Sequence, residues 1–64
     1  MITIEITTRN PTVPGWCAIF DGGDMPQGVP IPLPFTARAS FGTVVSDLLQ
    51  RFPGAQVYSN DVVS

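Results

Sequence analysis

The sequence predicts an α+β fold in which one amphipathic helix packs on a small, mostly antiparallel sheet of three or four strands. Two patterns support this prediction. Isoleucine alternates with polar residues over 2–8, which is the period of a strand with one buried face. Apolar residues recur at the spacing i, i+3, i+4, i+7 over 41–52, which is typical of a helix with one buried face. The expected order is therefore strand, strand, loop, short strand, helix, strand.

The first two strands are expected to form a hairpin. The strand at 2–8 is followed by a connection at 9–14, whose two prolines and asparagine are turn formers. A second strand at 15–20 would place three side chains on one face: Trp16, Ala18 and Phe20. A connection of this length suits two antiparallel neighbours.

Residues 21–34 form a loop rich in proline and glycine. Proline has no amide donor and fixes φ, so this loop cannot be a helix or a central strand. We expect residues 29–35 to run extended, either as polyproline-like chain or along an edge of the sheet. These residues either cover the domain's own core or face a partner. A short strand at 35–39 is expected to follow.

The helix has start and stop signals at both ends. Ser40 is the expected N-cap, because its hydroxyl can accept a hydrogen bond from a free amide of the first turn. Asp47 and Arg51 form a favourable i, i+4 pair, and Pro53 with Gly54 ends the helix. The buried face is expected to contain six residues: Phe41, Val44, Val45, Leu48, Leu49 and Phe52.

The C-terminal residues complete the sheet with a strand at 55–59, followed by a frayed tail at 60–64. With 64 residues, the chain is expected to be a single domain, 1–64, near the smallest size that folds without metals or disulfides. The aromatic side chains are expected to lie mainly in its core.

Charged residues make up only 12% of the chain, about half the usual share, and lysine is absent. Such a neutral surface favours self-association or a protein partner, although a codon bias against lysine would also explain it. Three scattered arginines are too few to neutralise a run of phosphates, so nucleic acid is not an expected partner. The sequence shows neither a membrane span nor a secretory signal, and with its single cysteine it predicts a cytoplasmic protein.

Few residues could support catalysis. Histidine, the commonest general base and metal ligand, is absent. Cys17 lies in a predicted strand and is expected to be a buried, inert thiol, the alternative being a reactive or intermolecularly bonded one. Asp21 and Asp24 flank two glycines and could approach one cation, but a tight turn explains this pattern more simply. We therefore assign no catalytic residue, cofactor or metal ligand, and expect no enzyme.

The sequence favours a non-catalytic protein-binding module. Its small size and lack of lysine suggest an accessory or inhibitor protein of a mobile element or phage, for example one acting on a host defence complex by protein–protein contact. The expected partner is a protein of unknown identity, not a nucleic acid or a membrane. The alternative is a homo-oligomeric structural protein whose edge strand or apolar face pairs with a second copy as a homodimer. The candidate contact residues are Asp21, Asp24, Met25, Ile31, Leu33 and Phe35.

Overall fold

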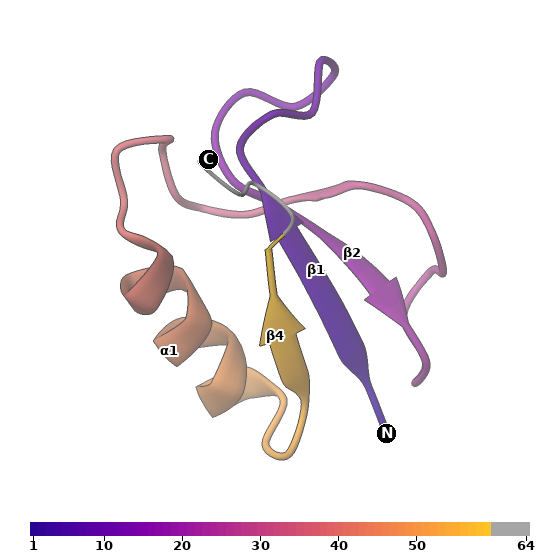
Figure 1. The fold of residues 1–64 in the computed structure, drawn as a ribbon. Coiled ribbons are helices and arrows are strands. Elements are labelled where there is room, and N and C mark those ends of the chain that lie inside the picture. The colour runs from indigo at the N-terminus through magenta and orange to yellow at the C-terminus, as the bar shows by residue number, and fades with distance from the viewer. Residues whose placement is uncertain (60–64) are drawn as a thin grey trace.

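One helix packs on a four-stranded mixed sheet in the computed structural model of this chain, which describes residues 1–59 (Figure 1). The elements are β1 (Thr3–Thr7), β2 (Cys17–Asp21), β3 (Ile31–Pro32), α1 (Phe41–Arg51) and β4 (Gln56–Tyr58). The strand order is β3-β2-β1-β4, with β4 parallel to β1 and the other two pairings antiparallel. The predicted α+β class is confirmed. The tail predicted at 60–64 lies outside the described residues.

The β1–β2 hairpin supplies most of the core. Its register pairs Ile4 with Phe20 and Ile6 with Ala18, so these side chains share the face that is covered by α1. Trp16 belongs to the same buried cluster, and its indole Nε1 donates a hydrogen bond to the Ala39 carbonyl at 2.9 Å. The shared face predicted for the second strand is confirmed.

The hairpin connection is a structured turn. The Asn10 side chain accepts hydrogen bonds from the Thr12 amide at 2.9 Å and from the Thr12 hydroxyl at 2.6 Å. The Val13 amide donates to the Asn10 carbonyl at 3.3 Å, and the Val13 side chain is buried.

Strand alternation places Cys17, which is completely buried, on the side of the sheet opposite Ala18 and α1. The prediction that Cys17 is buried is confirmed.

We expect the Cys17 thiol to react with a maleimide at least about 100-fold more slowly in the native protein than in the urea-unfolded chain. A reagent reaches a fully buried sulfur only through local or global opening. Labelling followed by mass spectrometry measures both rates, and native labelling within a few-fold of the unfolded rate would contradict an inert thiol.

The third strand lies in the segment predicted to be a loop. β3 pairs with β2 at the sheet edge, and Leu33 donates its amide to the Trp16 carbonyl at 3.0 Å. The predicted edge path for residues 29–35 is therefore right, and the predicted strand at 35–39 is wrong. After Phe35 the chain must leave the sheet to reach α1, and it does so in a turn closed by the Ala39 amide and the Thr36 carbonyl at 3.0 Å.

Both ends of α1 agree with their sequence signals. Ser40 is the N-cap, and its Oγ accepts from the Thr43 amide at 3.2 Å. Asp47 and Arg51 form the expected ion pair at 3.1 Å. At the C-terminal end the Phe52 amide donates to the Leu48 carbonyl at 2.8 Å, and the helix stops before Pro53.

The buried stripe of α1 is narrower than the sequence predicts. Val44 and Leu48 are buried and Val45 and Phe52 are partly buried, whereas Phe41 is 44% and Leu49 40% exposed. Strands of two to five residues make a sheet too small to cover six helical positions. The prediction that the aromatic residues lie mainly in the core is wrong for two of them, Phe41 and Tyr58, and Tyr58 is 43% exposed.

Candidate functional site

The six predicted contact residues fall into two groups. Asp21, at the end of β2, and Asp24, in the following loop, are exposed. The other four are partly buried and pack against the core: Met25, Ile31, Leu33 and Phe35. The structure therefore places the carboxylates on the surface, while the apolar side chains share their area between the core and solvent.

The loop after β2 is held closed by a residue that the sequence interpretation missed. The Gln27 side-chain amide donates to the carbonyls of Met25 at 2.6 Å and Gly22 at 3.1 Å, and its oxygen accepts from the Gly22 amide. The Gly28 amide also donates to the Phe20 carbonyl at 3.2 Å. Glutamine is not among the residues that favour turns, so the sequence carries no local signal for this role.

Residues 29–35 lie along the β3 edge as a row of partly exposed apolar side chains. Val29 is 51% exposed, and Ile31, Leu33 and Phe35 are intermediate. Prolines separate these side chains and limit the conformations open to the segment. The sequence predicted that residues 29–35 either cover the core or face a partner. In the structure Ile31, Leu33 and Phe35 do both, because one side of each contacts the core and the other side is exposed.

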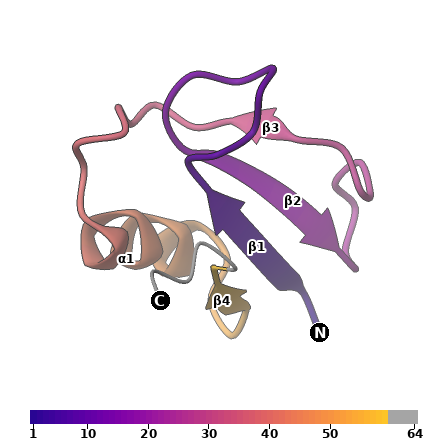
Figure 2. The same cartoon turned by 45° about the horizontal axis from the view of Figure 1, so that its top comes forward.

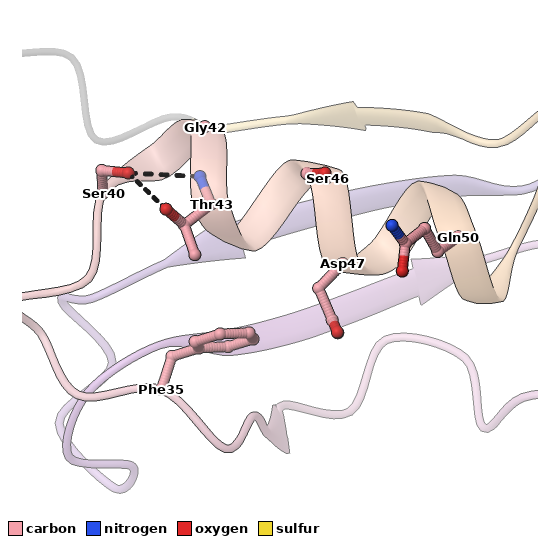
Figure 3. A pocket seen from close by; sticks show the side chains of 7 residues that line it. All are labelled: Phe35, Ser40, Gly42, Thr43, Ser46, Asp47 and Gln50. Atoms are coloured by element: carbon pink, nitrogen blue, oxygen red, sulfur yellow. Dashed lines mark hydrogen bonds between the residues drawn. The ribbon is translucent and has the colours of Figure 1, made fainter.

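An open groove of about 610 Å³ runs between Phe35 and the polar face of α1. Figure 3 shows Phe35 on one side of the groove and the helix residues along the other. Its lining consists of Phe35, Ser40, Gly42, Thr43, Ser46, Asp47 and Gln50. Only Phe35 was predicted as a contact residue. The helical residues were missed because the groove exists only where the chain crosses from β3 to α1.

The groove is lined mainly by hydrogen-bonding groups. Ser40 Oγ and Thr43 Oγ1 lie 2.8 Å apart at its N-terminal end. Asp47 is the one ionisable residue among the described residues that line it, and its carboxylate is paired with Arg51. Hydroxyl and amide groups next to one aromatic ring suit a peptide, whose backbone offers donors and acceptors at regular spacing.

Comparisons with protein-family models, curated proteins and solved structures gave no match. Over residues 1–59, no helix has the length and apolar character needed to cross a bilayer. The same residues contain no cluster of three histidine, cysteine, aspartate or glutamate side chains placed to hold a metal ion. The candidate site therefore rests on the geometry of this chain.

Proposed function

We propose that this chain is a non-catalytic protein-binding module whose contact surface combines residues 29–35 with the groove beside Phe35. The observation that supports this proposal is the row of large apolar side chains that stay partly exposed along a proline-restricted edge. Exposed apolar groups in a continuous row are typical of protein contact surfaces.

Restriction by proline favours binding. A flexible segment loses conformational entropy when a partner fixes it, and that loss weakens the complex. Here three prolines restrict residues 29–35, and the segment is anchored to the hairpin at both Leu33 and Phe35. The Trp16 amide donates to the Phe35 carbonyl at 3.3 Å, next to the bond from Leu33 to the Trp16 carbonyl. A partner therefore meets a largely preformed surface.

The groove adds a polar border to this apolar row. Protein interfaces commonly combine an apolar centre with hydrogen-bonding groups around it. Ser46 and Gln50 are exposed on α1 and line the groove opposite Phe35. An extended segment of the partner would lay an apolar side chain over Phe35 and direct its backbone polar groups toward α1.

The biological role that fits such a surface is blocking or adapting a larger protein. A chain of 64 residues can cover a patch on a partner without contributing chemistry. We propose that it acts as an accessory or inhibitor protein of a mobile element or phage. This role is suggested by the small size and the absence of lysine.

Comparing how much partner is captured by the immobilised wild type and by a variant tests the contact surface. We expect the double variant Val29→Ser and Phe35→Ala to retain less than about a tenth of the partner bound by the wild type, because hot-spot truncations cost about 2 kcal/mol or more. Immobilised wild type and variants are exposed to lysate of the encoding organism, and the affinity of the enriched protein is then measured by calorimetry after purification. Phe35 packs partly against the core, as Ile31 and Leu33 do, so the stability of the double variant is measured together with its binding.

Leu49→Ser is the matched control, since Leu49 is also an exposed apolar residue but lies on α1 outside the groove lining. It should bind the partner as the wild type does. Unfolding curves for all three proteins establish that the variants are folded. Undiminished binding by the double variant, or a loss confined to the control, would reject this surface.

A further inference from the structure

We infer that the outer edge of β4 pairs with β4 of a second copy, antiparallel across a two-fold axis, so that two sheets join into one. This inference does not rest on the proposed function, because β4 lies at the end of the sheet opposite β3. An edge strand with unpaired backbone groups is a ready template for another strand. The sheet has two such edges, and they differ in one decisive respect.

Prolines block one edge and leave the other open. Along the β3 edge, Pro30, Pro32 and Pro34 lack amide donors, so another strand could not form a regular ladder there. β4 consists of Gln56, Val57 and Tyr58 and contains neither proline nor charge. Proline and charge are the residues with which proteins usually protect edges. Among residues 1–59, the β4 edge has neither protection.

The backbone of β4 is suited to pairing with itself. The Gln56 amide donates to the Ile2 carbonyl at 2.9 Å, so Gln56 directs its backbone polar groups toward β1. Successive residues of a strand alternate, so the amide and carbonyl of Val57 point away from β1. Two residues directly opposite in an antiparallel pair can exchange two hydrogen bonds. A two-fold axis beside Val57 would make this exchange with Val57 of the second copy.

An apolar flank of α1 lies beside this edge. Figure 3 shows Phe35 on one side of α1 and β4, in pale yellow, on the other. The helical residues Phe41, Val45 and Leu49 follow the spacing i, i+4, i+8 and therefore form one line on the flank away from Asp47 and the groove. Figures 1 and 2 both show α1 running next to β4. If two β4 edges paired, the line of apolar residues on α1 of one copy would approach the same line on α1 of the other copy.

The chemistry of the surface favours a second copy as its occupant. A two-fold contact brings each group near its own copy, so a charged surface would repel itself. The residues of β4 and of this flank of α1 are all uncharged: Phe41, Val45, Leu49 and Val57 on the face covered by α1, and Gln56 and Tyr58 on the opposite face, where Glu5 of β1 is the neighbour of Tyr58. The two-fold axis would also place Tyr58 opposite Gln56 of the second copy, where a phenol and an amide can share a hydrogen bond.

The available area predicts a weak dimer. A fully exposed large side chain offers about 150–250 Å². Phe41 and Leu49 on α1 and Tyr58 on the opposite face of β4 are 40–44% exposed, so the two faces beside this edge together provide roughly 200–250 Å² per copy. A standard interface buries about 800 Å² per partner. We therefore expect a dissociation constant on the order of 0.1 mM.

Sedimentation equilibrium tests the association. Between about 10 µM and about 1 mM, the apparent mass should rise from 6.9 kDa toward twice that value. Leu49→Lys should weaken association at least about tenfold, because it brings two like charges together and removes apolar area. Val29→Lys places the same charge at an exposed apolar residue on the β3 side and should associate as the wild type does.

Hydrogen exchange of the wild type tests the register without any variant. Protection of the Val57 amide should increase with protein concentration by about fourfold over the same range, whereas the Gln56 amide, already bonded within one copy, should change little. A mass of 6.9 kDa up to about 1 mM would overturn the inference. Protection of Val57 that is independent of concentration would also overturn it, by showing that the edge is covered within one copy. Protection that requires another protein would assign the edge to that protein instead.

Discussion

Replacing Leu48 by alanine is expected to lower the free energy of unfolding by about 3 kcal/mol, whereas the same change at Leu49 should lower it by less than about 1 kcal/mol. Leu48 is 2% exposed and packs in the cluster that contains Ile4 and Val44. Its truncation leaves a cavity that neighbouring side chains cannot fill completely. Leu49 is 40% exposed, so most of the removed area already contacts water.

Urea unfolding of both variants, followed by Trp16 fluorescence and far-UV circular dichroism, measures the difference. Because a domain of 64 residues has only a few kcal/mol of stability, we expect Leu48→Ala to be partly unfolded even without urea, so its folded fraction in buffer is compared with that of the wild type. Measurement at about 10 µM keeps self-association out of the comparison. Equal losses for Leu48→Ala and Leu49→Ala would mean that α1 is rotated about its axis, so that both side chains are buried to a similar extent.

The contrast between Leu48 and Leu49 also shows which features of the fold the spacing of apolar residues predicts. The spacing of apolar residues indicates that α1 exists, where it begins and which side faces the sheet, because those properties depend on neighbours in the sequence. The width of the buried stripe depends on the size of the opposing sheet. Phe41 and Leu49 belong to the same pattern as Val44 and Leu48, yet they extend past the strands that would cover them.

In the sheet, too, the features that depend on neighbouring residues were predicted, and those that depend on residues distant in the sequence were not. Alternation at β1 and β2 predicts both strands and their shared buried face. The short β3 was predicted only as an edge alternative, because its pairing depends on the approach of Leu33 to Trp16, seventeen positions earlier. Similarly, Phe35 was identified as a candidate contact residue, whereas the groove partners Ser46 and Gln50 were not, since no local pattern places α1 opposite Phe35.

Gly15→Ala is expected to lower the free energy of unfolding by about 3 kcal/mol, roughly three times the cost of Gly28→Ala. Gly15 and Gly28 have φ values of +80° and +71°, which an alanine adopts at a cost of about 1 kcal/mol. A Cβ at Gly28 would have no atom within 4 Å. A Cβ at Gly15 would lie 2.6 Å from the Phe35 carbonyl oxygen, so the backbone itself would have to move.

Comparing the two alanine variants separates this close approach from the strain that both share. The oxygen that would be displaced also accepts the Trp16 amide, so Gly15→Ala should loosen the path that holds Phe35 beside the groove. Thermal and urea unfolding measure the stability, and partner capture by the folded fraction measures the effect on the contact surface. Similar losses of stability for the two variants would show that the backbone at Phe35 can move away from the added Cβ at little cost. Weakened capture by Gly15→Ala alone would connect the local packing around Gly15 to binding, because this residue lies outside the groove lining and affects it only through the position of Phe35.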